Sequence, residues 1–330
     1  MHKITRIAFN SAGWQRPTGD ARKFETIDTY NHKFGFGHED WLFRAEWLID
    51  GWRYAFIQGV NKSHEKLVKA GQPFDLTLYT IQPDKKRRFV AVISAVECLD
   101  HQQAQDAVSL FKELGWYGDM VKEIKAVGGE PAALGNAKWA KDILNVRFRQ
   151  ENVRLCVPDT YAMPDDPILR RWRYQLYDAE DKNPANDGAN HIGRVGSTSL
   201  PQIQPVMRGA TSAVVYTPEH ARMQEKLMID LSKEYPKAKA LREQYFIDVS
   251  VQTEQELILF EIKSDLEPRT VIRQALGQIL EYAYHPNRSH ALPVQLVIVG
   301  RRPLTASDAD YLKYLTTRFS LPLSYRVVEI

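Results

Sequence analysis

The feature that most constrains the fold is the order of strand-like and helix-like patterns between Thr217 and Val328. Thr217-Pro218-Glu219 is a helix start, because proline is favoured in the first helical turn. An apolar stripe at helical spacing, from Met223 to Leu231, extends this helix to about Tyr235. The patterns that follow predict strands and helices in this order: strand 245–252, turn 253–256, strand 257–263, helix 270–284, strand 294–299, helix 305–319 and strand 323–328. This order predicts a mixed sheet flanked by helices.

The first half of the chain mixes β structure with a few helices, so the class expected for the whole chain is α+β. We expect a β-rich, barrel-like first domain, in which a capping Asp100 starts a helix and Gly115 ends it. The expected strands are 52–60, 74–81 and 89–96, the expected helices are 101–114 and 119–127, and 145–157 is extended.

A change of composition after residue 157 indicates a domain boundary. Residues 158–215 hold six prolines, and the stretch 178–199 is polar and rich in glycine. At ~150 residues per domain, a chain of 330 residues has room for two. The sequence predicts a first domain over 1–178, a linker over 179–215 and a second domain over 216–330.

Charge and cysteine usage exclude several classes of protein. The formal net charge of +3 neither demands nor excludes nucleic acid, and residues 216–330 carry 15 basic and 15 acidic residues, so the excess lies outside them. No apolar run is long enough to span a bilayer, and the N-terminus lacks the apolar segment of a secretory signal. Cys98 and Cys156 are too few for a disulfide scaffold or a cysteine-built zinc site. We expect a cytoplasmic protein without membrane contact.

The basic run 85–88 suits either a solvated loop or a phosphate contact.

The turn at 253–256 determines which residues of the two flanking strands face each other. If these four residues form a hairpin loop, opposite residues have numbers that sum to 509, which places Asp248 opposite Glu261. Lys263 lies two residues further on and points to the same face. Two opposed carboxylates repel each other unless a cation lies between them.

A divalent cation with oxygen ligands fits this pair of carboxylates. Mg²⁺, or Mn²⁺, would acidify a bound water and neutralise charge on a phosphate, and a neighbouring lysine would orient that water or stabilise the transition state. Glu225, on the preceding helix, could supply another acidic ligand, and it could equally be a solvated glutamate. The alternative for the pair itself is a solvated strand face with Lys263 as the counter-ion.

The helix after the second of these strands carries a polar stripe, Gln274, Gln278 and Tyr282, at a spacing of four. With Asp248, Glu261 and Lys263, and with the segments "ALGQILEYAY" and "LVIVGRRPLTASDADYLKYL", residues 217–330 resemble nuclease domains of the PD-(D/E)xK superfamily. The resemblance implies metal-dependent hydrolysis of a DNA phosphodiester bond. It also implies catalytic roles for Gln278 and Tyr282. Ile247 stands where the motif has proline.

The N-terminal part is rich in aromatic residues, 12 of the first 60, which suit either a core or a pocket for a planar ligand. Its segments "SAGW", "GFGHEDWLFR", "YAFIQGVNKS" and "FDLTLYTI" resemble the EVE and PUA-like modules that read modified bases in modification-dependent restriction enzymes. A flipped base needs an aromatic stack and polar groups at its edge. The candidates for these contacts are Trp14, Asn31, His38, Trp41 and Asn61.

Together these patterns predict a Mg²⁺-dependent endonuclease that acts on double-stranded DNA carrying modified bases, in defence against phage. Two alternatives stay open: a repair or recombination nuclease that recognises DNA structure, and a non-catalytic DNA-binding protein. Because double-strand cutting by one active site per chain requires pairing on DNA, a homodimer is possible.

Overall fold

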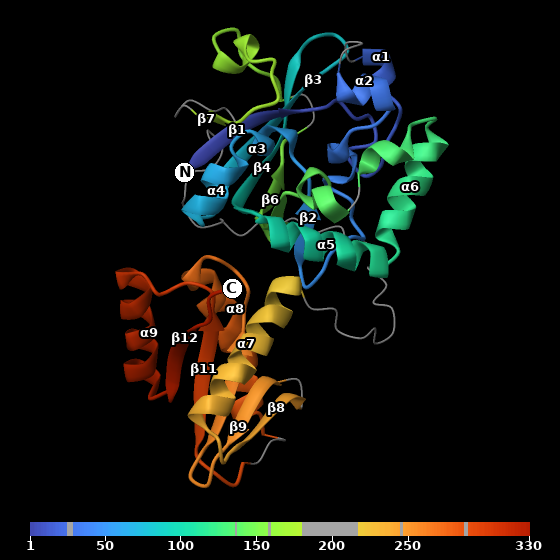
Figure 1. Cartoon of the computed structure of the whole chain (residues 1–330). Coiled ribbons are helices and arrows are strands. Elements are labelled where there is room, and N and C mark those ends of the chain that lie inside the picture. Colours follow the sequence, from blue (N-terminus) through green and yellow to red (C-terminus); the bar gives the residue numbers. More distant parts are fainter. Residues whose placement is uncertain (25–28, 136, 158–159, 180–216, 245–246, 287–289) are drawn as a thin grey trace. The chain divides into compact units, whose positions relative to one another are not determined.

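Tyr216 begins the second of two units into which the computed structural model of the chain divides, residues 1–215 and 216–330. The structure describes residues 1–24, 29–135, 137–157, 160–179, 217–244, 247–286 and 290–330 (Figure 1). The second unit starts at the residue where the sequence predicts the second domain to start. Apart from Ala179, the predicted linker 179–215 lies outside the described residues.

The first unit contains a mixed sheet, to which seven described strands contribute. They are β1 (His2–Ile7), β2 (Trp52–Ala55), β3 (Phe74–Ile81), β4 (Arg87–Cys98), β5 (Val146–Arg149), β6 (Val153–Leu155) and β7 (Tyr177–Asp178). The path of paired strands is β2-β5-β4-β3-β1-β7, and β6 pairs with β4. β1 runs parallel to β3, whereas its other neighbour β7 is antiparallel. Among the described strands no pairing joins β2 to β7, so the expected barrel-like sheet is open here.

Short helices connect the strands of the first unit. They are α1 (Ala21–Phe24), α2 (Tyr30–Phe34), α3 (Gln58–Asn61), α4 (His64–Ala70), α5 (His101–Glu113) and α6 (Trp116–Ala126), with the 3-10 helices η1 (His38–Trp41), η2 (Pro131–Leu134), η3 (Ala137–Asp142), η4 (Gln150–Asn152) and η5 (Pro167–Arg170). The prediction that Asp100 starts α5 is confirmed: its side chain accepts from Gln103 N at 2.8 Å, and the Gln103 side chain accepts from Asp100 N at 2.8 Å. This capping box satisfies two backbone donors that the first turn leaves open.

The predicted strand 52–60 is too long, because β2 ends at Ala55. The next backbone N–H groups are bonded by side chains: Ile57 N donates to Asn145 Oδ1 at 2.9 Å, and Gln58 N donates to Glu39 Oε1 at 2.8 Å. The strand ladder therefore stops and α3 begins. By contrast, β3 has the bounds that its β-branched and aromatic residues predict.

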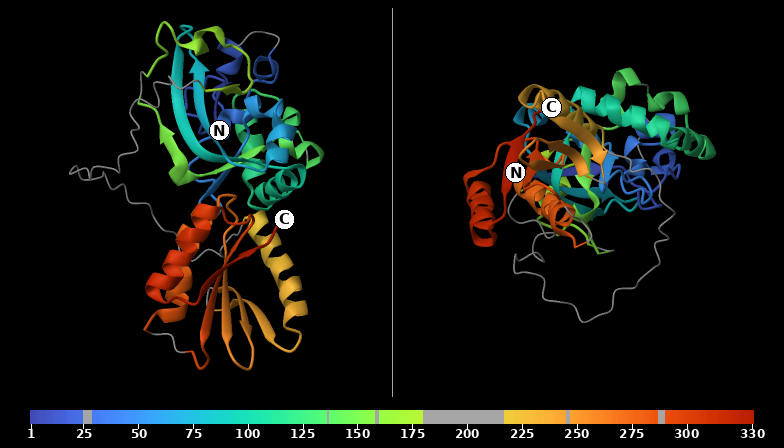
Figure 2. Two further views of the ribbon diagram at one scale, coloured as in Figure 1. Left: turned by 90° about the vertical axis from the view of Figure 1, so that its left-hand side faces the viewer. Right: turned by 90° about the horizontal axis from the view of Figure 1, so that it is seen from below.

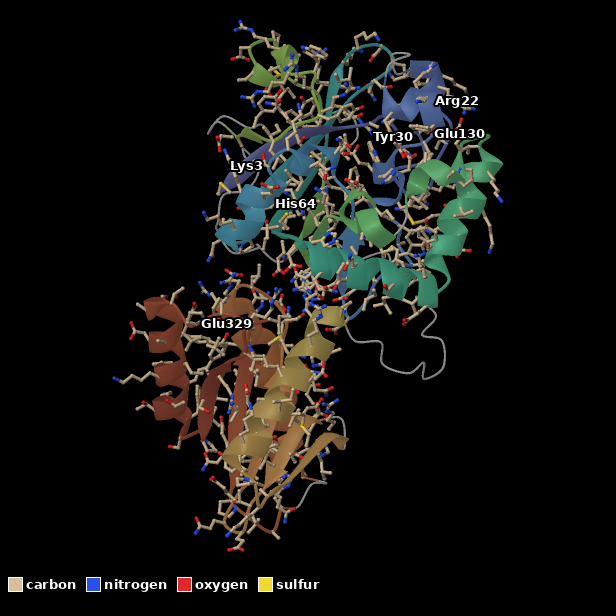
Figure 3. All side chains as sticks on the ribbon, in the orientation of Figure 1. Lys3, Arg22, Tyr30, His64, Glu130 and Glu329 are labelled. Atoms are coloured by element: carbon tan, nitrogen blue, oxygen red, sulfur yellow. The ribbon has the colours of Figure 1, made fainter. Side chains whose placement is uncertain are left out.

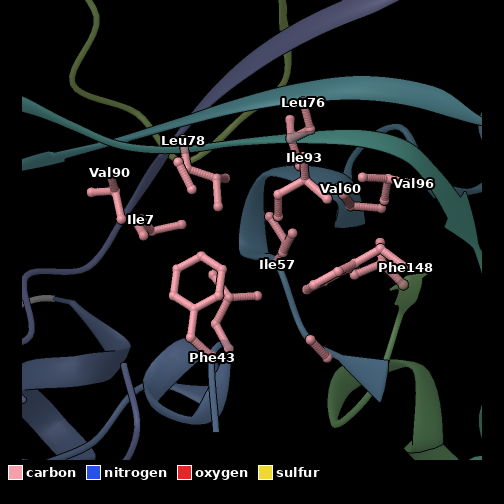
Figure 4. Close-up of a cluster of buried hydrophobic side chains, with 14 of the residues drawn as sticks. Ile7, Phe43, Ile57, Val60, Leu76, Leu78, Val90, Ile93, Val96 and Phe148 are labelled. Atoms are coloured by element: carbon pink, nitrogen blue, oxygen red, sulfur yellow. The ribbon is translucent and has the colours of Figure 1, made fainter. Parts of the chain in front are cut away.

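The core of the first unit divides into hydrophobic clusters. Figure 4 shows one that β1, β3, β4 and β5 build with loop residues; it includes Ile7, Phe43, Ile57, Leu78, Ile93 and Phe148. A second cluster packs α5 and α6 onto tryptophans 41, 47 and 52. Most of the aromatic residues of the first 60 positions thus fill core.

The second unit has the predicted order of elements plus one strand. Its elements are α7 (Pro218–Glu234), β8 (Lys239–Gln244), β9 (Ile247–Gln252), β10 (Leu257–Ile262), α8 (Pro268–Tyr284), β11 (Val294–Gly300), α9 (Ala306–Phe319) and β12 (Leu323–Val327). The sheet order is β12-β11-β10-β9-β8, with β10, β11 and β12 parallel and β8, β9 and β10 antiparallel. Helices cover both faces of this sheet (Figure 2): α7 packs on one through Met223, Leu227 and Leu231, and α8 and α9 pack on the other. The α+β class is confirmed. Among the described residues no helix is long and apolar enough to cross a membrane.

Candidate active site

The hairpin of β9 and β10 has the predicted register. Leu257 pairs with Gln252, and the ladder continues to Phe260 opposite Val249, so each pair sums to 509. Thr253 N donates to Glu256 O at 3.0 Å and closes the predicted loop. Asp248 and Glu261 are the next residues, immediately beyond the last pair.

Asp248 occupies the place where the two strands stop pairing. Its Oδ2 accepts the backbone N–H of Ile262 at 2.7 Å, a donor that a continued ladder would give to a strand carbonyl. His220 Nε2 lies 3.4 Å from Asp248 Oδ1, and Gln224 Nε2 donates to the Asp248 carbonyl at 2.9 Å. From α7, His220 thus approaches the carboxylate and Gln224 holds the backbone of Asp248, whose side chain is 6% exposed.

Glu261 and Lys263 form an ion pair at the same end of β10. Lys263 Nζ lies 2.9 Å from Glu261 Oε1, and the side chains are 13% and 3% exposed, respectively. The backbone N–H of Lys263 donates to Val299 O of β11 at 3.0 Å, which fixes the strand end that carries the amine. The prediction that Lys263 lies on the same side as Glu261 is confirmed by this pair.

Other buried polar groups gather around this ion pair. Most of the buried polar residues described in the second unit fall in residues 217–224, Asp248 and residues 261–265, together with Arg301. Thr217 Oγ1 lies 3.2 Å from Ser264 Oγ, and Arg301 Nη1 donates to Ser264 O at 3.4 Å. Buried polar groups cost free energy unless they are bonded, so such a concentration is typical of a functional site rather than of a packed core.

The donor chemistry at this site fits a divalent cation. Four carboxyl side chains are buried here, those of Asp248, Glu261, Glu219 and Asp265. Two basic residues of this region, Lys263 and Arg301, partly balance their negative charge. Among the described residues no group of three or more His, Cys, Asp or Glu side chains is arranged to hold a metal ion. Mg²⁺ commonly binds through one or two carboxylates and takes its other ligands from water and substrate phosphate, so Asp248 and Glu261 suffice in number.

The exposure of Glu225 favours the alternative that this residue is a solvated glutamate. Glu225 is exposed on α7, whereas Glu219 is fully buried in its first turn, next to His220. The signal was present in the sequence: Glu219 lies four residues before Met223 and eight before Leu227, on the stripe that packs against the sheet. Glu225 lies two residues after Met223, which turns it away from that stripe.

Gln278 and Tyr282 lie away from the carboxylates. Because β10 and β11 are parallel and Val294 pairs with Leu257, α8 must return the chain to the start of β10. At ~1.5 Å per residue, Gln278 lies ~15 Å and Tyr282 ~21 Å along the helix from its first residue. Gln278 is exposed, and Tyr282 packs against the apolar cluster under α8. Gln274, half-buried and nearest the start of α8, is the member of the stripe closest to the site.

The first unit contains a cavity of about 1080 Å³. It lies among elements far apart in sequence, between η1, α2, α3, η2, the β3–β4 hairpin and the segment 172–174. The aromatic residues that line the cavity are Phe9, Phe24, Tyr30, Phe56, Trp172 and Tyr174. Cations line it from Arg6, Lys62, Lys85, Arg87 and Arg173. Part of the basic run at the β3–β4 hairpin therefore borders a cavity.

Three of the five residues predicted to contact a base line this cavity, namely Asn31, His38 and Asn61. The two tryptophans do not. Trp14 is 3% exposed in the cluster of Figure 4 and donates from Nε1 to Ala8 O at 2.9 Å. Trp41 is 5% exposed, stacks on Trp47 and donates to Glu123 Oε2 at 2.8 Å. The expectation that either forms a wall of the pocket is wrong for this cavity, because both rings and both indole N–H groups are used inside the protein.

Burial shifts the titration of the groups at the inner wall. It lowers the pKa of His38 to about 4, so the imidazole is neutral at pH 7, and the Tyr30 hydroxyl lies 2.8 Å from its Nε2. Tyr30, labelled in Figure 3, begins α2. Burial raises the pKa of Glu39 to about 7, although Ala8 N and Gln58 N both donate to its carboxylate. Hydrogen-bonding groups held in a hollow between apolar rings form a typical ligand pocket.

No protein-family model, no curated protein and no solved structure matches this chain.

Proposed function

We propose that the second unit hydrolyses phosphodiester bonds of DNA with Mg²⁺ or Mn²⁺ held by Asp248 and Glu261. The observation that supports this most is the end of the β9–β10 hairpin. Two buried carboxylates follow its last pair, and the amine of Lys263 lies 2.9 Å from one of them.

Each residue of this group has a role that follows from its contacts. A bound divalent cation would acidify a water ligand and neutralise charge on the phosphate. Asp248 is oriented by Ile262 N and lies next to His220, so the direction of its carboxylate is fixed. Lys263 is placed to orient the attacking water or to stabilise negative charge in the transition state, because its Nζ is held at Glu261.

We propose for the first unit the recognition of DNA that carries a modified base, which makes the protein a modification-dependent restriction enzyme in phage defence. The cavity supports this with rings for stacking, neutral hydrogen-bonding groups at one wall and cations for phosphate. Such an enzyme meets incoming DNA in the cytoplasm, and a pair of chains would cut both strands. A repair nuclease that recognises DNA structure is the alternative within enzymes, and a non-catalytic DNA-binding protein is the alternative outside them.

Digestion of matched plasmids, modified and unmodified, by the full chain with Mg²⁺ tests these proposals together. We expect cutting of modified plasmid, no cutting with EDTA, and loss of cutting in Asp248→Ala and Lys263→Ala. Glu225→Ala is the matched control, because this glutamate is exposed, and it should cut normally. Equal cutting of both plasmids would favour the repair nuclease, and binding without cutting at any metal concentration would favour the non-catalytic protein.

A further inference from the structure

The cavity of the first unit is larger than a small modification of a base requires. Cavities of ~300–1,000 Å³ enclose whole drug-sized ligands, and this one measures about 1080 Å³. One methylene group changes how well a pocket discriminates between two ligands by ~10- to 200-fold only where the pocket packs against that group. A cavity of this size has room for a base together with a group much larger than a methyl.

One wall of the cavity carries neutral and acceptor groups that are held in place. Asn61 Oδ1 accepts from Asn145 Nδ2 at 2.9 Å, and Asn61 Nδ2 lies 3.5 Å from Asp142 Oδ1. His38 is fixed between the Tyr30 hydroxyl and the ring of Phe36, with the ring centroids 5.5 Å apart. Amide, imidazole and carboxylate groups held in this way are suited to a ligand that presents several hydroxyl groups, each of which both donates and accepts.

Another part of the lining supplies flat rings and positive charge. The guanidinium of Arg6 lies 4.4 Å from the ring centroid of Tyr174, and its Nη1 donates to Trp172 O at 2.8 Å. Lys85 and Arg87 border the cavity from the β3–β4 hairpin. Rings stack on a base or on the apolar face of a sugar, and exposed cations suit the phosphates beside an extruded nucleotide.

We propose that this cavity accepts a flipped nucleotide whose base carries a sugar, that is, a glycosylated hydroxymethyl-pyrimidine in DNA. This inference rests on the proposed recognition of modified DNA and adds the chemical class of the modification. The base and the sugar would together fill a volume that a methylated base leaves largely empty. The hydroxyl groups would bond Asn61, Asp142 and His38, and the flanking phosphates would meet Lys85 and Arg87.

Binding by the full-length Asp248→Ala variant tests the proposal without cleavage. Fluorescence anisotropy would compare four duplexes of one sequence, with cytosine, 5-methylcytosine, 5-hydroxymethylcytosine or glucosylated 5-hydroxymethylcytosine at one position. We expect the glucosylated duplex to bind at least about tenfold more tightly than the cytosine duplex, and the methylated duplex to bind within about twofold of cytosine. A preference for 5-methylcytosine, or for unglucosylated 5-hydroxymethylcytosine, would overturn the sugar inference and leave modification sensing intact. Equal binding of all four would overturn both, and the nuclease proposal is tested separately by plasmid cutting.

A cavity-filling variant locates the site. Gln58 is exposed at the cavity, so Gln58→Trp can place a large ring in the open volume. We expect it to remove the preference for the glucosylated duplex while binding to plain DNA and the thermal midpoint stay unchanged. Lys66→Trp, at an exposed position of α4 that does not line the cavity, is the control and should keep the preference. Retention of the preference in Gln58→Trp, with the variant folded, would place sugar recognition elsewhere.

Discussion

At the scale of single residues, the carboxylates of the proposed active site, Asp248 and Glu261, are buried and each contacts a neighbour. The chain pattern predicted the register of the β9–β10 hairpin and the neighbourhood of Glu261 and Lys263, because the four-residue loop fixes which residues lie opposite each other. His220 and Gln224 could not be assigned to this group from the chain pattern, since nothing local shows which turn of α7 faces Asp248.

Asp248→Asn and Glu261→Gln should abolish cleavage and leave DNA affinity within about twofold, because a lost metal ligand stops chemistry while phosphate contacts supply affinity. Lys263→Ala should slow cleavage by ~10²–10³-fold, the usual effect of losing a charge-stabilising group. Single-turnover cleavage and anisotropy measure the two quantities. Glu225→Gln is the control that should change neither, and an active Asp248→Asn would refute the assignment of the site.

Substitution of tryptophans in the first unit should distinguish those that belong to the core from one that lines the cavity. Trp14→Ala and Trp41→Ala should each lower the free energy of unfolding by ~3–5 kcal/mol, because both rings are buried. Trp172→Ala should barely change stability, since this side chain is 62% exposed, but should weaken binding of modified DNA. Denaturant unfolding and anisotropy distinguish the two effects. A Trp41→Ala variant that keeps its stability but no longer discriminates between modified and plain DNA would show that Trp41 contacts the ligand.

His38 gives the stability of the first unit a definite pH dependence. Its pKa is lowered to about 4 in the folded state from about 6.5 unfolded, so the unfolded chain binds the proton more readily between these values. The contribution of His38 to the free energy of unfolding should therefore fall as the pH falls from 6.5 to 4, by up to ~3 kcal/mol. The difference in stability between the parent and His38→Gln, measured at pH 7 and pH 4.5, should shrink in acid. A difference independent of pH would contradict the lowered pKa.

At the scale of elements, the sequence pattern predicted the bounds of the helices and strands that interactions between near neighbours in the chain determine. The helices and strands of the second unit begin and end within a few residues of their predicted positions, because caps, apolar periodicity and turn residues act over short distances. β8 was missed: its sequence KALREQ lacks β-branched and aromatic residues, and it forms by pairing with β9 at the edge of the sheet. For the cavity of the first unit, the sequence indicated Asn31, His38 and Asn61. It could not indicate Phe9, Phe56 and Trp172, because only the fold brings these three residues together.

The direction of α8 leads to a prediction for its polar stripe. Gln278→Ala should leave the single-turnover cleavage rate within about twofold of the parent, because Gln278 is exposed well along a helix that runs away from the carboxylates. Gln274→Ala should slow cleavage more, since this residue lies in the first half of α8. A Gln278→Ala variant that cuts more slowly than Gln274→Ala would show that Gln278 contributes more to cleavage than Gln274 does.

At the scale of the whole molecule, the proposed function assigns binding and chemistry to different units, and this division can be tested. A fragment of residues 1–179 should bind modified duplex more tightly than plain duplex, with an affinity that falls as salt increases. Residues 216–330 alone should show no such preference. Anisotropy at 50 and 200 mM salt measures both, with the full chain as reference. A modification preference in the second fragment alone would refute the division.

The position of β1 sets the order in which the growing chain can acquire its structure during synthesis. Lys3 of β1 pairs with Leu76 of β3 on one side and with Asp178 of β7 on the other. A ribosome therefore releases this strand long before both of its neighbours exist, and the sheet is complete only after Asp178 has left the exit tunnel. Contacts between such distant residues form slowly because a long loop must close first. Until then the apolar side chains of Ile4 and Ile7 lack part of the neighbours that bury them in the folded unit, and exposed apolar side chains of this kind favour misfolding and aggregation.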